Sequence, residues 1–133
     1  MYTYSKPSIV LFFLLKYVIF FILLMVIRGD YRLFSSGIVD AIAYFVIFMM
    51  PLPALIALIF TIPLFYIFQL KKTIFLIFSL LAILIAEYFV YTLYASSTNF
   101  VNGIYNGLVS VVVGIIFFSF LKIALLKNRK NDW

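Results

Sequence analysis

The sequence predicts an all-α membrane protein with four transmembrane helices in a small bundle, the second helix long and kinked by proline. Of the 133 residues, 68% are hydrophobic and only 11% are charged, whereas a soluble domain is about half apolar and about a quarter charged. A soluble fold of this length has too small a core for so many large apolar side chains. The apolar residues also form continuous blocks, unlike the alternating strands of a membrane barrel. Helices are therefore expected, because they pair their own backbone polar groups.

Four segments are long enough to cross a bilayer, which takes about 20 apolar residues. They are residues 8–27, 38–68, 73–95 and 103–126. The connections between them are short, so residues 1–133 are predicted to form a single integral membrane domain. The first segment is long for the apolar region of a signal peptide and is not followed by a small-residue cleavage site. We therefore interpret it as a permanent span.

The distribution of basic residues predicts that both termini lie in the cytoplasm, because Lys and Arg are enriched in cytoplasmic loops. With this orientation only Arg28 and Arg32 lie outside. The residues on the inner side are Lys6, Lys71, Lys72, Lys127, Arg129 and Lys130, with Lys122 near the inner boundary. The amino-acid usage resembles that of an AT-rich genome. A multi-pass protein of a bacterial inner (plasma) membrane is therefore the expected class.

The second segment predicts a broken helix. As one straight helix, residues 38–68 would be about 46 Å long, against a hydrocarbon core of about 30 Å. The segment contains Pro51, Pro53 and Pro63, and each proline lacks an N–H and clashes with the carbonyl four residues earlier. We therefore place a helix break at Pro51 and Pro53. A re-entrant hairpin would carry the two lysines that follow to the outside, so a kinked, tilted crossing is preferred.

Lys16 lies in the first span, about 12 Å from its start. A central lysine costs roughly 2.5–3.5 kcal/mol to insert, but its long stem can carry the ammonium toward the headgroups. One interpretation is therefore a lysine that extends to the membrane surface. The other is a lysine that faces the bundle or a partner chain.

Glu87 is the second intramembrane charge and lies in the outer half of the third span. A carboxylate this deep is protonated, paired or in contact with water. Tyr91 follows one helical turn later, and Tyr94 extends the same polar stripe. One interpretation is a neutral Glu87 bonded to a tyrosine or a backbone carbonyl. The alternative is a candidate ion or proton site formed by Glu87 and Tyr91, or a contact for a partner residue.

A further hypothesis joins the two intramembrane charged residues, Lys16 and Glu87. Their Cα depths differ by about 9 Å, so the extended side chains would just meet if their helices were adjacent. Intramembrane charges usually find a partner. The sequence by itself leaves open whether this pair forms.

Small residues form a helix-packing stripe in the fourth span. They are Gly103, Gly107, Ser110 and Gly114, at spacings of four, three and four. Small side chains on one face let another backbone approach closely. The stripe therefore predicts either a contact within the monomer or the seam of a homo-oligomer.

Polar residues near the predicted outer ends of spans are assigned to capping and turns. Asp40 suits the N-terminus of the second span, with Ser35 and Ser36 as candidate caps. Asn99, Asn102 and Asn106 lie at the start of the fourth span, where they predict turn chemistry or an interaction surface in the outer loop.

Composition argues against several functional classes. The chain has no His and no Cys and only four acidic residues, so the usual general base and metal ligands are missing. No phosphate-binding loop or other catalytic motif is present. We therefore expect no enzyme activity, no metal and no cofactor. The basic residues occur in short clusters between apolar runs, so nucleic acid is not an expected partner.

Two functional hypotheses remain. The first is a non-enzymatic membrane protein that acts through protein–protein contacts, as an accessory subunit of a complex or a bacterial defence or immunity component. The alternative is a small oligomeric ion channel or transporter that uses Glu87 and the helix break at Pro51 and Pro53, as broken helices in transporters do. The expected partners are the lipid bilayer and other membrane subunits, or further copies of this chain.

Overall fold

The computed structural model describes residues 4–95 and 99–131, with side chains for all of these except Leu33, Ala95 and residues 124–131. All regular elements in these ranges are helical. They are α1 (Lys6–Arg28), α2 (Arg32–Ser35), α3 (Ile38–Tyr44), the π-helix η1 (Phe45–Met49), α4 (Pro51–Ile67), α5 (Thr73–Ala95) and α6 (Phe100–Asn131). The predicted all-α class is confirmed.

Three continuous helices are long and apolar enough to cross a membrane. They cover Lys6–Arg28, Thr73–Tyr94 and Phe100–Ile123. A fourth crossing is formed if Ile38–Met49 and Pro51–Ile67 act together as one bent span. The described part of the chain therefore contains three or four candidate spans, in the order that the sequence predicts.

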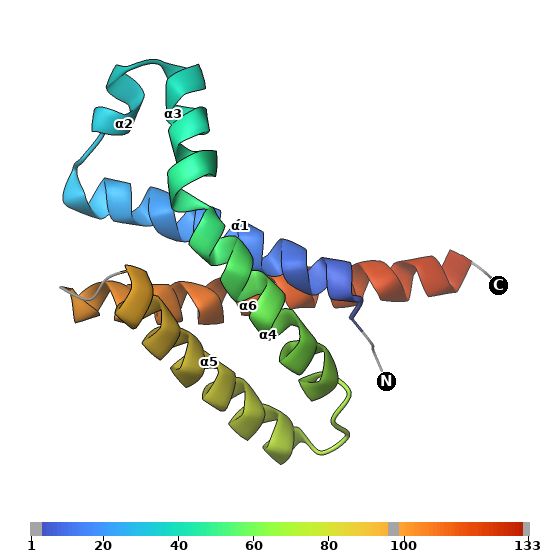
Figure 1. Cartoon of the computed structure of the whole chain (residues 1–133). Coiled ribbons are helices and arrows are strands. Elements are labelled where there is room, and N and C mark those ends of the chain that lie inside the picture. Colours follow the sequence, from blue (N-terminus) through green and yellow to red (C-terminus); the bar gives the residue numbers. More distant parts are fainter. Residues whose placement is uncertain (1–3, 96–98, 132–133) are drawn as a thin grey trace.

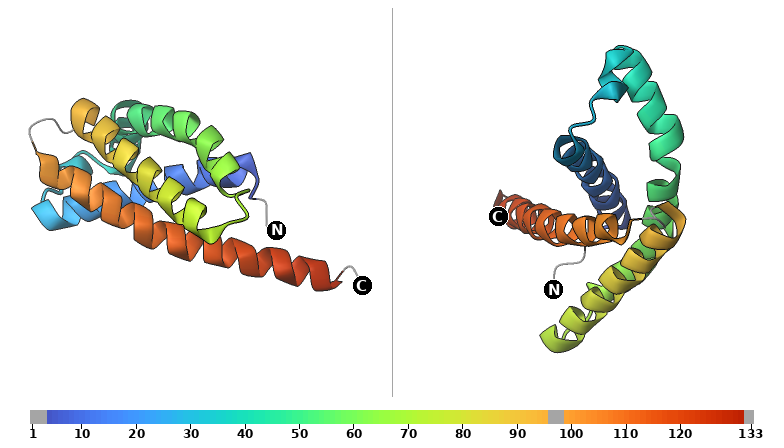
Figure 2. Two further views of the ribbon diagram at one scale, coloured as in Figure 1. Left: turned by 90° about the horizontal axis from the view of Figure 1, so that it is seen from below. Right: turned by 90° about the vertical axis from the view of Figure 1, so that its left-hand side faces the viewer.

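The long helices of the bundle run roughly antiparallel to the neighbours that they pack against (Figure 1). Helix α1 packs against α4 and α6, and α5 packs against α4 and α6 on the other side (Figure 1). The start of α1 and the end of α6 lie toward the same end of the molecule (Figure 2). A chain that crosses a membrane an even number of times would have its first and last helices placed in this way, with their outer ends on the same side. The cytoplasmic location of that end stays a prediction from the charges.

The ends of α1 follow from local sequence. Ser5 precedes the helix, and its side-chain oxygen accepts a hydrogen bond from the Ser8 N–H at 3.4 Å, which satisfies a backbone donor with no partner inside the helix. Pro7 lies in the first turn, where its missing N–H costs nothing. Gly29 ends the helix in the left-handed conformation, with φ 61°, which favours glycine.

The second predicted span is bent at a break, as its prolines predict. Residues 38–68 divide into α3, the five-residue π-helix η1 and α4, with a bend of 49° at the break. Pro51 is the first residue of α4, where no intrahelical N–H bond is needed. The predicted break therefore occurs at Pro51, and α3 turns away from the bundle there (Figure 1). Pro53 and Pro63 are contained within α4.

The proposed serine caps of the second span are wrong. Gly37 occupies the N-cap position of α3, with φ 105° and no side-chain cap bond. Ser35 lies in the short helix α2 and donates from Oγ to the Arg32 carbonyl at 2.6 Å. Asp40 lies in the first turn of α3, where a negative charge is favourable.

An exposed ion pair orders the loop between α1 and α2. Arg32 bonds both carboxylate oxygens of Asp30, with Nε–Oδ1 at 2.9 Å and Nη2–Oδ2 at 2.8 Å. These hydrogen bonds hold the pKa of Asp30 at about 2, below its ordinary value of 3.8. Because the folded-state pKa is the lower one, the pair stabilises the fold above pH 3.8, and this contribution is lost as the pH falls toward 2.

We expect Arg32→Gln to return the pKa of Asp30 toward 3.8. Carbon-13 NMR titration of the labelled Asp30 carboxyl in micelles measures the change. Arg28→Gln is the matched control, because Arg28 affects this carboxyl only by weaker through-space attraction. An Asp30 pKa that stays near 2 in Arg32→Gln would show that another group holds it.

Candidate buried polar site

The two charged residues within the predicted spans meet in the middle of the bundle. Lys16 on α1 is 0% exposed and Glu87 on α5 is 4% exposed. The Lys16 ammonium donates to Oε1 of Glu87 in a buried ion pair. The backbones of α1 and α5 do not themselves pack together, so the long side chains bridge the space between them. The structure thus shows the hypothesised pair. The interpretation of Lys16 as a lysine that extends to the membrane surface is wrong.

Two further donors converge on the same carboxylate oxygen. Tyr17 Oη donates to Glu87 Oε1 at 2.6 Å, and Asn106 Nδ2 on α6 donates to it at 3.4 Å. Three helices therefore contribute to one polar cluster, made of Lys16, Tyr17, Glu87 and Asn106. Charge-assisted bonds of this kind are the strong ones in an apolar interior.

The predicted partnership of Glu87 with Tyr91 is corrected by this geometry. The hydroxyl that bonds Glu87 belongs to Tyr17. Tyr91 is buried and packs its ring against Phe20 and Tyr17, with centroids 5.3 Å and 6.2 Å apart. Tyr94 is 78% exposed and is not part of the cluster. Helical spacing placed Tyr91 on the face of Glu87, but α1 brings a closer hydroxyl.

Sequence reasoning missed Tyr17 and misplaced Asn106. Asn106 is 1% exposed and lies inside the bundle, not in the outer loop. A signal was present, because Asn102, Asn106 and Ser110 recur at intervals of four and form a polar stripe on an apolar helix. Tyr17 carried no such signal, since neighbouring residues on a helix do not share a face.

Aromatic rings complete the surroundings of Lys16. Its Nζ lies 4.5 Å from the ring centroid of Tyr17 and 5.4 Å from that of Phe13. Both distances are within the range of cation–π attraction. The ammonium is therefore held by one carboxylate and two rings, and the resulting cluster is formally neutral.

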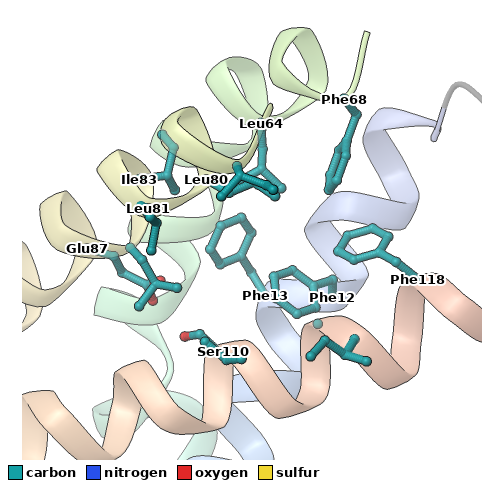
Figure 3. A pocket seen from close by; sticks show the side chains of 15 residues that line it. Phe12, Phe13, Leu64, Phe68, Leu80, Leu81, Ile83, Glu87, Ser110 and Phe118 are labelled. Atoms are coloured by element: carbon teal, nitrogen blue, oxygen red, sulfur yellow. The ribbon is translucent and has the colours of Figure 1, made fainter. Parts of the chain in front are cut away.

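Glu87 also borders a large apolar cavity of about 520 Å³. Figure 3 shows its carboxylate reaching toward the cavity, opposite Phe12 and Phe13. The lining comes from α1, α4, α5 and α6, with Phe68 just beyond α4, and Glu87 and Ser110 are its polar residues. The remaining lining residues are Phe12, Phe13, Leu64, Phe68, Ile77, Leu80, Leu81, Ile83, Leu84, Val111, Gly114, Ile115 and Phe118.

The small-residue stripe of α6 lies against two other helices of the same chain. A Cβ at Gly103 would lie 2.5 Å from Thr92 Oγ1 on α5, and one at Gly107 would lie 3.4 Å from Leu84. A Cβ at Gly114 would lie 3.6 Å from the Phe12 ring on α1. Ser110 Oγ donates to the Asn106 carbonyl at 2.8 Å. The structure therefore uses the stripe for packing within the monomer.

A second cavity, of about 880 Å³, lies near the opposite end of the bundle from the chain termini. Helices α1 and α6 are joined there by a hydrogen bond from Arg28 Nη2 to Asn102 Oδ1 at 2.9 Å. The cavity is lined by Phe21, Leu24, Met25, Arg28, Asp30, Arg32, Ser36, Asp40, Tyr44, Met49, Tyr91 and Asn102. Its lining is therefore both apolar and charged.

The predicted helix break does not join the Glu87 cluster. Neither Pro51 nor Pro53 lines the cavity that Glu87 borders. Pro53 is fully buried within the helix packing. Among the residues that the structure describes, no group of three acidic side chains gathers where a metal ion could be held.

Comparisons with protein-family models, curated proteins and solved structures find no match to this chain. Its function has to be inferred from the geometry of the described residues.

Proposed function

We propose that this chain is a non-enzymatic four-span protein of a bacterial inner membrane that acts through protein–protein contacts, with both termini in the cytoplasm. In this role it is an accessory subunit of a membrane complex or a component of a defence or immunity system. The observation that carries the proposal is the exposed apolar surface of α3 and η1. The second cavity, which has charged residues in its lining, forms a cleft between this segment and the bundle.

The α3–η1 segment is apolar and poorly covered by the rest of the chain. Val39 is 79% exposed and Phe48 is 70% exposed, and η1 has no buried residue. The backbone of α3 approaches only its chain neighbours α2 and η1, and Figure 1 shows it rising away from α1. This surface is available to another apolar helix.

The cleft beside this segment contains groups that lipid chains cannot match. The second cavity is lined by two arginines and two aspartates, Arg28, Arg32, Asp30 and Asp40, and also by Tyr44. Lipid tails offer no polar partner, whereas a protein helix can supply complementary charges and hydrogen bonds. A partner chain with an apolar face and a few polar residues therefore fits this cleft better than lipid alone.

The channel or transporter hypothesis receives less support. The prolines of the helix break and Glu87 lie at different places in the fold. The Glu87 carboxylate is already bonded to Lys16 and Tyr17. The cavity that it borders is lined almost entirely by apolar side chains, and conduction paths usually place their polar groups along a hydrated pore.

Photocrosslinking in the source cells tests the proposed function. A photoreactive amino acid replaces Val39 in α3, and in a control chain it replaces Phe78 in α5, which is 67% exposed and borders neither cavity. We expect a discrete protein adduct from position 39 and none from position 78. Reversing the cleft charge with Asp40→Lys should lower this adduct about twofold to fivefold, the range of an exposed charge pair.

The contrary result is equally specific. Equal protein crosslinking from positions 39 and 78, or lipid adducts alone at both, would contradict a partner at the α3–η1 surface. Proton or ion flux through the purified chain in liposomes, abolished by Glu87→Gln, would instead favour the channel hypothesis.

A further inference from the structure

We infer that the cavity beside Glu87 is a binding site for a neutral long-chain alcohol, whose hydroxyl donates to Oε2 of Glu87 and whose chain fills the apolar space. This site lies on a different part of the bundle from the α3–η1 cleft. The inference therefore goes beyond the proposed protein–protein function and does not depend on it.

The cavity has the size and the lining of a ligand pocket. Its volume of about 520 Å³ lies within the range of about 300–1,000 Å³ that small-molecule sites occupy. Aromatic side chains from different helices, among them Phe13 and Phe118, form the inner wall (Figure 3). Such pockets are mostly apolar, with one or a few polar groups that orient the ligand.

The opening of the cavity lies on an exposed apolar face of α5 and α6, which lipid would cover in a membrane. Its rim includes Leu81 on α5, which is 50% exposed, and Ile115 on α6, which is 65% exposed. Helices α5 and α6 lie close near their connection and diverge away from it (Figure 2). A ligand dissolved in the bilayer can therefore enter sideways, without crossing water.

Only one of the two carboxylate oxygens of Glu87 accepts hydrogen bonds from the described residues. The bonds from Lys16, Tyr17 and Asn106 all end on Oε1. Oε2 receives no hydrogen bond from the residues that the structure describes, and the side chain borders the cavity. A carboxylate oxygen in apolar surroundings without a donor is costly. A donor carried by the ligand would remove that cost.

The charges of the cluster favour a ligand whose polar group is neutral. Lys16 already neutralises Glu87, so a cationic ligand would leave an uncompensated charge in an apolar site. An anionic head would be repelled by the carboxylate. An alkane would fill the same space but leave Oε2 without a donor. A hydroxyl on an aliphatic chain meets both requirements.

Photoaffinity labelling of the full chain in lipid nanodiscs tests the inference. The probe is a long-chain alcohol that carries a diazirine in its chain, and mass spectrometry locates the labelled residues. We expect labels on the cavity wall. Myristyl alcohol should displace the probe at a concentration at least about tenfold lower than tetradecane, because a hydrogen bond to a charged group is worth that factor or more.

Matched variants separate the site from general lipid contact. Leu81→Trp fills the rim of the cavity, whereas Ile85→Trp places the same side chain one turn further along α5, outside the lining. Labelling of the cavity wall should be lost in the first variant and kept in the second. The double variant Lys16→Met/Glu87→Leu removes the acceptor without leaving an unpaired charge, and should bind alcohol and alkane equally.

Three results would overturn the inference. They are equal displacement by alcohol and alkane in the unmodified chain, labels spread evenly over all exposed helix faces, and an alcohol preference that survives in Lys16→Met/Glu87→Leu. The first two would show that the cavity holds bilayer acyl chains only. The third would assign the preference to a group other than Glu87.

Discussion

Lys16→Met is expected to lower the free energy of unfolding by about 3–5 kcal/mol, because it leaves the Glu87 carboxylate buried without a counter-charge. Glu87 is 4% exposed, so its carboxylate is enclosed by the bundle. The bonds from Tyr17 and Asn106 would remain, but neither donor carries a charge. Unfolding in mixed micelles, followed by circular dichroism as the denaturing detergent increases, measures the loss.

The double variant Lys16→Met/Glu87→Leu should recover most of this stability. Replacing both members of a buried pair by apolar residues of similar volume is often neutral or stabilising, by about 1–4 kcal/mol. Lys6→Met is the control, because Lys6 is exposed and contacts the Phe65 ring at 5.2 Å; its loss should cost less than about 1 kcal/mol. If the stability losses of Lys16→Met and of Glu87→Leu alone simply add in the double variant, Lys16 and Glu87 are not coupled.

Gly103→Ala is expected to destabilise the contact between α5 and α6 by about 1–3 kcal/mol, the usual cost of overpacking. The new Cβ would lie 2.5 Å from Thr92 Oγ1 and 2.6 Å from the Tyr88 ring. Thr92 is 3% exposed, and its β-branched side chain is restricted at χ1, so it has little room to move. The same micelle unfolding measurement, compared with the unmodified chain, gives the cost.

Gly114→Ala is the matched control on the same helix. Its Cβ would meet the Phe12 ring at 3.6 Å, an ordinary contact distance. Alanine there should be neutral or stabilising by up to about 1 kcal/mol, because glycine is a poor helix former. Adding Thr92→Ala to Gly103→Ala should recover part of the loss. Equal stability of the two alanine variants would contradict the close approach at Gly103.

Features that depend on residues close together in the sequence were predictable, whereas features that depend on helix packing were not. The helical segments were predictable because an apolar run of about 20 residues has few other ways to pair its backbone in lipid. The break at Pro51 was predictable because proline acts on its own helix. The partition of residues 38–68 into α3, η1 and α4 was not, since packing decides how a bend is distributed.

In the candidate site, too, some residues were evident from the sequence and others were placed only by helix packing. Lys16 and Glu87 stood out in the sequence because charge is rare in a membrane span. Tyr17 did not stand out, and Asn106 was assigned to the outer loop, because which side chains bond Glu87 depends on how α1 and α6 pack in the bundle. The cavity could not be predicted at all, since it is the space left where α5 and α6 diverge.

The sequence by itself thus determined the helical class, the candidate spans and the two charged residues within them, because hydrophobic length and the rarity of charge in an apolar run are local properties. Only the tertiary structure decided that Lys16 and Glu87 pair with each other, that Tyr17 replaces Tyr91 as the hydroxyl donor, and that one oxygen of Glu87 borders an apolar cavity. These features depend on which helices are neighbours. In a membrane that choice depends on close packing and hydrogen bonds between helices, because apolar residues are equally at home in lipid.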